Sequence, residues 1–280
     1  MHASLSRFNH RRLQPLLPSE WSAAELDAAT PLVRAELAFV EEERSAVATW
    51  AADAPSSAAE FVRWFEHLRD IGPGQSDPLF AWLANEADDK SMAWFLTQEV
   101  AGEAGFEDLV AMTQLQLPHR AKLEMARNYW DEMGRGNAGG MHGPMLADLS
   151  AALALPIATT PVVWPAQALG NLMVALASHR HYAFQSVGAL GVIELTAPGR
   201  AEQVNAGLKR LGVTADVRRY YAIHATLDVK HSQAWNAEVL MPLVEEDPRR
   251  ARAIAEGALM RLFAGARCFA HYRAHLGLLS

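Results

Sequence analysis

The stretch AQALGNLMVALASHRHYAFQSVGALGVIELT, residues 166–196, predicts the fold. Its apolar residues, among them Leu172, Leu176 and Leu190, fall on nearly every side of a helix. A helix without a polar face lies in the middle of a bundle, where other helices cover it on all sides. Gly170 and Gly188 disfavour a helix interior, so they indicate close helix packing or space kept for a ligand. We therefore predict a central helix of an all-α protein.

Helical periodicity also dominates the rest of the chain. Pro and Gly separate apolar segments of helical spacing, and the alternating Val, Ile and Thr runs that are typical of strands are absent. Residues 1–30 are predicted to form an N-terminal arm, and residues 31–280 a single helical domain. The predicted helices are 31–52, 57–70, 77–102, 104–116, 118–134, 141–150, 166–196, 200–211, 216–242 and 247–276.

Composition excludes several classes of protein. Half of the 280 residues are apolar and a fifth are charged, as in an ordinary globular domain. The net charge of -7, without a basic block, argues against a nucleic-acid partner. Residues 149–178 lack charged side chains, but prolines leave an unbroken run of only 13 residues after Pro165. A membrane span needs about 20, so we expect no membrane partner.

The single cysteine, Cys268, excludes an intrachain disulfide and any zinc cluster built of thiolates. Such sparse cysteine use fits a reducing compartment, which predicts a cytoplasmic location. Residues 1–16 contain no apolar core long enough for a signal peptide. The high apolar content further predicts a homodimer, although no interface can be assigned from the sequence.

Glu194 is the most anomalous residue in the predicted central helix. It stands near the end of the apolar stretch, in Gly191-Val-Ile-Glu194-Leu. A carboxylate buried alone is very costly, so it must be paired, protonated or bound to a cation. The alternative is that the helix ends here and Glu194 reaches solvent near Pro198. Burial would make Glu194 a candidate metal ligand.

Three more candidate ligands lie in the stretch His224-Ala-Thr-Leu-Asp228-Val-Lys-His231. Their spacing of i, i+4 and i+7 puts the three side chains on one face of a helix. Imidazole and carboxylate groups without a thiolate suit iron or manganese. The alternative is a polar stripe on a helix that faces solvent. The motif needs further carboxylates to make a complete metal site.

The segment Asp131-Glu132-Met-Gly-Arg-Gly-Asn-Ala-Gly-Gly-Met-His142 adds two candidates. Glu132 and His142 are ten residues apart, but the four intervening glycines disfavour a regular helix. A loosened helix or a bulge would direct both side chains at one point. The alternative is a Gly-rich surface turn with an unremarkable Glu and His.

Glu99 is the last candidate carboxylate. It follows the aromatic and apolar stretch Ala93-Trp94-Phe-Leu-Thr-Gln98, which predicts an inward-facing position. Glu103, one helical turn later on a similar face, is the alternative ligand. The other eight histidines, including His179 and His181, have no carboxylates at complementary spacing, so we interpret them as structural.

Taken in chain order, these motifs resemble those of the haem-oxygenase-like diiron oxidases and oxygenases, a family of iron-containing redox enzymes. The matching elements are Gln98-Glu99, Asp131-Glu132-Met-Gly-Arg-Gly…His142, Glu194 and His224-xxx-Asp228-xx-His231. The resemblance covers roughly residues 76 to 242 and implies a haem-oxygenase-like multi-helix bundle with a non-haem diiron site. Carried over position by position, the implied ligands are Glu99, Glu132, His142, Glu194, His224, Asp228 and His231.

The resemblance implies an O₂-dependent non-haem iron oxidoreductase, with two iron ions as cofactor and O₂ as co-substrate. Its expected partner is a small organic substrate similar to an amino acid, an amine or a fatty acid. Four carboxylates would neutralise the charge of two Fe(II) ions and so permit their burial. The substrate pocket is expected beside the metals, with Trp94, Phe184, Tyr220 and Tyr221 as candidate lining residues.

Three alternatives remain at this point. A haem-binding protein of the same fold would use one dominant axial histidine and a pocket without these carboxylates. A cofactor-free or thiaminase-like enzyme would need a nucleophilic cysteine, whereas Cys268 lies in an apolar segment of the last predicted helix. The third alternative is a metal-free helical interaction module, in which all the residues singled out above are surface charges.

Overall fold

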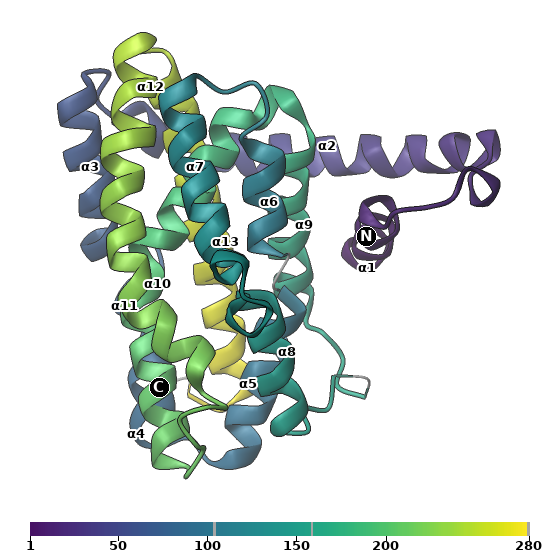
Figure 1. Cartoon of the computed structure of the whole chain (residues 1–280), viewed down its shortest axis with the longest axis vertical. Helices are drawn as coiled ribbons and strands as arrows, with labels where there is room; N and C mark the ends of the chain where they lie inside the picture. Colours follow the sequence, from purple (N-terminus) through teal and green to yellow (C-terminus); the bar gives the residue numbers. More distant parts are fainter. Residues whose placement is uncertain (103–104, 158, 279–280) are drawn as a thin grey trace.

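The computed structural model describes residues 1–102, 105–157 and 159–278, and the regular elements of this part of the chain are helices joined by loops (Figure 1). One isolated β-bridge joins Met133 and Met141. The prediction of an all-α bundle is therefore confirmed. The α-helices are α1 (His2–Leu13), α2 (Ala23–Ala52), α3 (Ala58–Ile71), α4 (Pro78–Asn85), α5 (Asp89–Gly102), α6 (Phe106–Thr113), α7 (His119–Glu132), α8 (His142–Ala152), α9 (Trp164–Ser178), α10 (Ala183–Arg210), α11 (Arg219–Trp235), α12 (Met241–Glu246) and α13 (Arg250–His275).

Helix α10 is the central helix of the bundle. It packs against α11, α13 and α4, and also meets α3, α6 and α9. Its first half is buried on every side because residues from Val187 to Val192 all lie in the core. The backbones of α10 and α13 touch, since a Cβ on Gly188 would overlap the carbonyl of Ile254. The close helix packing that the sequence indicated for Gly188 is confirmed.

The predicted helix 166–196 is in fact two helices, α9 and α10, separated by a 3₁₀ turn at Arg180–Tyr182. Tertiary hydrogen bonds hold this break. Arg180 donates to the carbonyls of Met112 and Thr113, and the Tyr182 hydroxyl donates to Glu41 at 2.6 Å. These partners lie far away in the sequence, so the apolar periodicity on both sides gave no sign of a break.

Helix α10 continues to Arg210, so the predicted break between 196 and 200 is wrong. Pro198 lies inside the helix and lacks the N–H that would bond the carbonyl of Glu194. Burial of Leu195, Ala201 and Val204 stabilises the helix on both sides of the proline. Glu194 therefore lies in the middle of a buried helix rather than at its end.

Two other predicted helices are interrupted. Residues 77–102 form α4 and α5, because residues 86–88 break the helix and Asp88 accepts a hydrogen bond from the N–H of Ser91 at 2.8 Å. Residues 216–242 become α11, which continues through a π-helical turn at Asn236–Leu240 into α12. Pro242 begins that last short helix, where its missing N–H does little harm.

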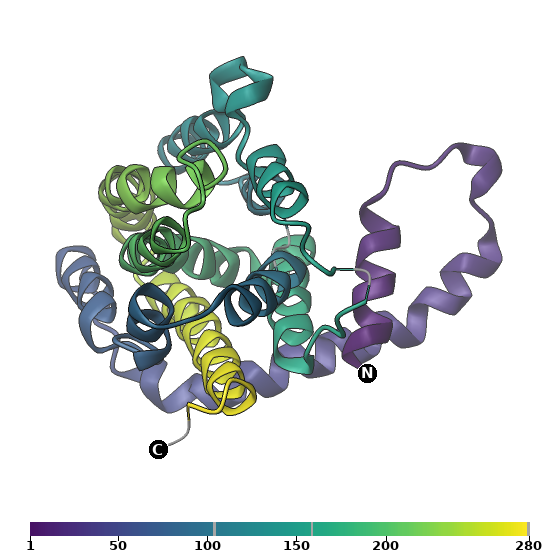
Figure 2. The same ribbon diagram turned by 90° about the horizontal axis from the view of Figure 1, so that it is seen from below.

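Helix α1 packs against α9 and α2, and the N-terminal half of α2 projects beyond the rest of the molecule (Figures 1 and 2). Arg12 of α1 binds the buried carboxylate of Glu36 through two hydrogen bonds of 2.9 Å. The predicted arm boundary at residue 30 falls inside α2. None of the helices in the described ranges has the length and apolar character needed to cross a bilayer.

Candidate metal centre

Four helices bring the candidate ligands together. Glu132 is the last residue of α7, His142 is the first residue of α8, and Glu194 lies in the middle of α10. Helix α11 supplies the other three from one face. Among the six, only His224 is half-buried, and the other five side chains are buried: Glu132, His142, Glu194, Asp228 and His231. The surface-charge alternatives for Glu194 and for the α11 motif are therefore excluded.

The Gly-rich segment between α7 and α8 is a tight loop rather than a loosened helix. It contains two 3₁₀ turns and is closed by the bridge between Met133 and Met141. Gly134 has a φ of 61°, and a Cβ there would overlap the backbone of Gly140. This close approach places the residues on either side of the bridge, Glu132 and His142, next to each other.

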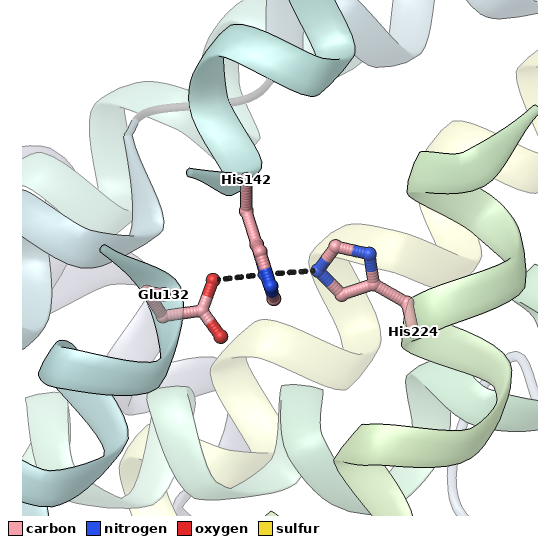
Figure 3. Close-up of side chains that lie close together, drawn as sticks. All are labelled: Glu132, His142 and His224. Carbon is pink, nitrogen blue, oxygen red and sulfur yellow. Dashed lines mark hydrogen bonds and ion pairs between the residues drawn. The ribbon is translucent and has the colours of Figure 1, made fainter. Parts of the chain in front are cut away.

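Glu132, His142 and His224 form the first group of potential ligands (Figure 3). Their ligand atoms all lie within 4.8 Å of one another. Nδ1 of His142 is 2.6 Å from Oε2 of Glu132 and 3.1 Å from Nε2 of His224. Nδ1 of His224 donates to the carbonyl of Tyr220 at 2.7 Å, so the proton of the neutral ring is on Nδ1. The lone pair on Nε2 is then directed at the group.

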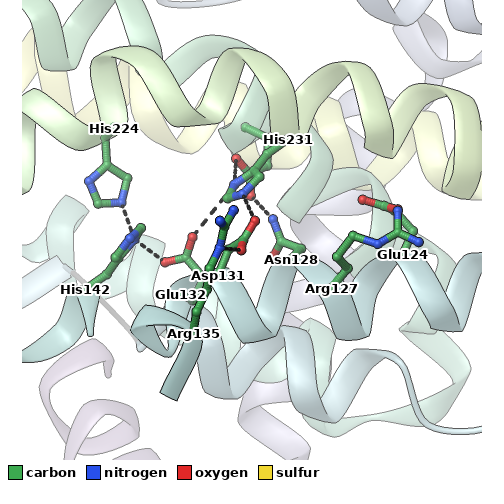
Figure 4. A network of polar contacts seen from close by, with 10 residues as sticks. Glu124, Arg127, Asn128, Asp131, Glu132, Arg135, His142, His224 and His231 are labelled. Atoms are coloured by element: carbon green, nitrogen blue, oxygen red, sulfur yellow. Dashed lines mark hydrogen bonds and ion pairs between the residues drawn. The ribbon is translucent and has the colours of Figure 1, made fainter. Parts of the chain in front are cut away.

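Glu132, Glu194 and His231 form the second group, again with ligand atoms within 4.8 Å. Figure 4 shows Glu132 and His231 of this group. Nδ1 of His231 lies 3.4 Å from Oε2 of Glu194 and 3.9 Å from Oε1 of Glu132. Glu132 thus belongs to both groups, with Oε2 towards the first and Oε1 towards the second. A carboxylate in this position can bridge two cations.

Two residues of α7 orient the second group, and the sequence did not identify them. Asp131 Oδ2 lies 3.2 Å from Nε2 of His231, and Asn128 donates to Oε1 of Glu194 at 2.6 Å. Metal-binding histidines commonly donate their second N–H to a carboxylate in this way. Asn128 precedes Glu132 by one helical turn, which is the only sequence signal that placed it on the same face.

The pKa shifts show that this cluster is under electrostatic strain as it stands. Burial and the nearby charge of Glu194 raise the pKa of Glu132 to about 8. Burial, Glu194 and Glu132 also hold the pKa of Asp228 well above its usual range. Burial opposes protonation of His231, but the contacts with Glu194 and Asp131 outweigh it and raise that pKa to about 9. The three carboxylates therefore repel one another, and a cation between them would relieve the repulsion.

Among the buried polar atoms of the described residues that lack a hydrogen-bond partner are two that could bind a metal, Oδ1 of Asp228 and Nδ1 of His231. A buried polar atom without a partner costs about 1–3 kcal/mol, so native proteins rarely leave one unexplained. Both atoms belong to predicted ligands, which is consistent with positions that a cation would fill. Asp228 belongs to neither of the two groups but lies in the same cavity.

A cavity of about 150 Å³ adjoins the cluster, and four of the six clustered residues line it: Glu132, Glu194, His224 and Asp228. Tyr220 and Tyr221 also line it, as expected. The expectation for the other two aromatic residues is wrong. Trp94 stacks on His275 with ring centroids 3.9 Å apart, and the ring of Phe184 lies 5.0 Å from the guanidinium of Arg250. The actual lining includes Phe80, Phe95, Phe106 and Phe269 instead.

Glu99 also lines this cavity, but its neighbours differ from those of the other six. It belongs to neither ligand group and faces Arg200, Arg261 and the Tyr272 hydroxyl. Burial raises the pKa of Glu99, while the two arginines and Tyr272 oppose this shift. The alternative ligand, Glu103, lies outside the described residues. The metal-binding role of Glu99 thus stays a prediction.

Cys268 is buried in α13, as its apolar surroundings predicted. Burial and the charge of Glu99 raise the pKa of this thiol to about 12. A nucleophilic cysteine needs a lowered pKa, because the thiolate is the reactive form. The structure therefore offers no support for a thiaminase-like reaction at Cys268.

Comparison with known proteins agrees with this site. Residues 93–266 match the family described as iron-containing redox enzymes, a span that includes all six clustered residues. No curated protein is significantly similar to the chain in sequence.

Solved structures share the fold. A CADD-like protein of unknown function from Nostoc punctiforme PCC 73102 superposes with a TM-score of 0.59 at 17% identity, over 78% of this chain and 95% of that one. A second crystal structure with the same description, from the same organism, gives a TM-score of 0.56 at 17% identity, over 86% and 98%. A domain of unknown function with a heme oxygenase-like fold, from Shewanella denitrificans OS217, gives 0.53 at 15% identity, over 79% and 90%. The bundle therefore has the haem-oxygenase-like fold.

Proposed function

The chain belongs to the family of iron-containing redox enzymes, and on that basis we propose that it is a non-haem diiron oxidase or oxygenase. It would use O₂ to oxidise a small organic molecule. The observation that carries the proposal is the position of Glu132. Its two carboxylate oxygens face two different groups of histidine and carboxylate ligands. A single metal site would need only one of these groups.

The residues present fit iron. The potential ligand atoms are imidazole nitrogens and carboxylate oxygens, without a thiolate. Such ligands suit Fe(II) and Mn(II), whereas a zinc cluster of the Cys type needs thiolates. Glu132, His142 and His224 would hold one ion. Glu132, Glu194 and His231 would hold the other, with Asp228 beside them. When bound, two ferrous ions would supply the electrons that begin the reduction of O₂.

The surrounding protein would fix these ligands in place. The carbonyl of Tyr220 holds the ring of His224 with Nε2 towards the site. Asp131 contacts Nε2 of His231 and so holds that ring with Nδ1 towards the site. Asn128 holds one oxygen of Glu194, which leaves its other oxygen for a metal. The apolar side chains around the cavity would limit the access of water to the oxidising centre.

The cavity beside the cluster is the proposed substrate site. Four of the six clustered residues line it, so a bound molecule would lie directly against the metals. Its other walls are mainly aromatic and aliphatic, as in most small-molecule sites. Glu99 would join the ligand set only by turning away from Arg200 and Arg261. The homodimer and the cytoplasmic location inferred from the composition remain predictions.

Anaerobic titration of the apoprotein with Fe(II) tests the proposal. We expect two ions per chain, with Mössbauer parameters of high-spin iron bound by nitrogen and oxygen. On exposure to air, the loaded protein should consume O₂, and faster when a true substrate is present. A stoichiometry of zero would favour the interaction module. A Soret band after titration with haem, without binding of free iron, would favour a haem protein instead.

A further inference from the structure

We propose that the substrate carries a carboxylate group and that Arg200 binds this group at one end of the cavity, away from the two ligand groups around Glu132. The inference rests on the proposed function and specifies the substrate class for the same site. The contacts that support it lie in the part of α10 that follows Glu194 and in the aromatic rings that pack against this part.

The cavity follows one face of α10. Glu194, Ala197 and Ala201 line it at intervals of three and four residues, and Arg200 lines it beside Ala197 and Ala201. At 1.5 Å per residue, Arg200 is about 9 Å further along the helix axis than Glu194. The two alanines between them have small side chains, which leaves open space from the carboxylate end of this face to the arginine end.

The guanidinium of Arg200 is held in position without using most of its donors. It lies 5.5 Å from the ring centroid of Phe269 and 6.0 Å from that of Phe80. One N–H group donates to Oγ1 of Thr196 at 2.9 Å, and Thr196 in turn donates to the carbonyl of Val192. A planar guanidinium that is anchored in this way beside two aromatic rings is preorganised for two parallel hydrogen bonds to a carboxylate.

The charges around Arg200 also favour an anion. The positive charge of Arg261 disfavours the charged form of Arg200, and the negative charge of Glu99 partly offsets this effect. Burial and Arg261 lower the pKa of Arg200 to about 10, so the group remains charged at neutral pH. A carboxylate from the substrate would add negative charge beside the guanidinium of Arg200.

The other residues that line the cavity determine the size and polarity of the part of the substrate that Arg200 does not bind. The cavity walls include Phe95, Leu146, Leu169 and Phe269, and its volume of about 150 Å³ is that of a small apolar cavity. Apolar cavities of roughly this volume hold a body about as large as benzene. The geometry thus points to a carboxylate of about six carbon atoms in all, whose apolar end would lie beside the metal ligands.

The metal-free protein can be tested by isothermal titration calorimetry with hexanoate, hexanol and hexylamine. We expect hexanoate to bind at least about tenfold more tightly than hexanol, as a charge-assisted pair provides. Norleucine distinguishes two kinds of carboxylate. Tighter binding than hexanoate would indicate an amino acid whose ammonium group meets Glu99, and weaker binding would indicate a simple acid. Equal binding of hexanoate and hexanol, or no binding of any carboxylate, would overturn the proposal.

Variants at position 200 provide the second measurement. Arg200→Gln should weaken hexanoate binding at least about tenfold, and Arg200→Lys should give an affinity between those of Arg200→Gln and the wild type. Arg249→Gln is the matched control, because that side chain is 91% exposed and pairs with Asp247. Unchanged hexanoate affinity in both variants at position 200 would refute the role of Arg200. Iron stoichiometry measured on the same samples tests the proposed function separately, since Arg200 is not among the metal ligands.

Discussion

Oε2 of Glu132 lies 2.6 Å from Nδ1 of His142, although the two residues are ten positions apart and belong to different helices. The loop between them makes this contact possible because Gly134 and Gly140 meet backbone to backbone. A Cβ on Gly134 would overlap the backbone of Gly140, whereas a Cβ on Gly140 would make only a tight contact with Gly134, at 3.1 Å. The candidate metal site therefore depends most on Gly134, a residue that carries no functional group.

Gly134→Ala tests this dependence. The position has a φ of 61°, which costs a non-glycine residue of order 1–3 kcal/mol, and the added Cβ would overlap Gly140. We expect weaker iron binding and a Tm lower by several degrees. Gly139→Ala is the control in the same loop, since its Cβ would meet only Oδ1 of Asn137, at 3.6 Å. Equal loss of iron in both variants would contradict the explanation.

Removing a ligand of the second group should abolish tight iron binding by that group and leave the helical fold largely intact. Glu194→Ala and His231→Ala each remove a member of the second group, so we expect no more than one tightly bound ion per chain. Iron content by elemental analysis and helicity by circular dichroism are the measurements. Glu238→Gln is the control, because that residue pairs with Arg120 at the surface. If all three variants retained two ions, the ligand assignment would be wrong.

Asp131 is expected to act through His231. Asp131→Asn should reduce iron affinity about 10- to 100-fold, as is common when the partner of a metal-binding histidine is changed. A competition titration with a chromogenic chelator measures this directly. Arg135→Gln serves as the control, because Arg135 is a largely exposed partner of Asp131. Similar losses in the two variants would instead indicate a general disturbance of the loop.

The metal-free protein should become less stable as the pH rises from about 6 to 9. The pKa of Glu132 is raised to about 8 in the folded state, so folding favours its protonated form, and that stability is lost between about 4.5 and 8. The pKa of His231 is raised to about 9, so its contribution is lost between about 6.5 and 9. We expect the Tm to fall over this range and Fe(II) to restore it. A smaller slope is expected for Glu132→Gln, and a Tm that rises with pH would contradict the assignment.

The N-terminal helix is anchored by one buried ion pair. Arg12 donates two hydrogen bonds to Glu36, which is fully buried and also contacts His179 at 2.8 Å. Arg12→Gln removes the charge partner, so we expect a loss of about 1.5–3 kcal/mol and faster proteolysis within residues 14–22. Limited chymotrypsin digestion, which can cleave after Trp21, and thermal melts measure both effects. Arg11→Gln should change little, because Arg11 is exposed and its partner Glu25 is partly exposed.

Much of the site could be predicted from the sequence, because it depends on local spacing. His224, Asp228 and His231 share a face of α11 as their i, i+4 and i+7 positions require. The apolar stretch around Glu194 predicted a buried carboxylate, and Glu194 is 2% exposed. These inferences succeeded since helix geometry alone relates the positions, whatever the helix packs against.

Other features escaped prediction because they depend on contacts between distant segments. Arg180 stabilises the break between α9 and α10 by donating hydrogen bonds to the carbonyls of Met112 and Thr113. The neighbours of Glu99 include Arg200 and Arg261, each more than a hundred positions later in the chain. Periodicity predicts which side of a helix is apolar, but it gives no indication of which distant residue faces it.

The sequence by itself determined the all-α class, the central apolar helix and the set of side chains that share the face of α11, because backbone geometry repeats every 3.6 residues. Only the tertiary structure decided that Glu132 faces two ligand groups at once, and that Asp131 and Asn128 orient their members. Those relationships depend on how α7, α10 and α11 pack against one another. That packing follows from the burial of side chains throughout the bundle rather than from any single motif.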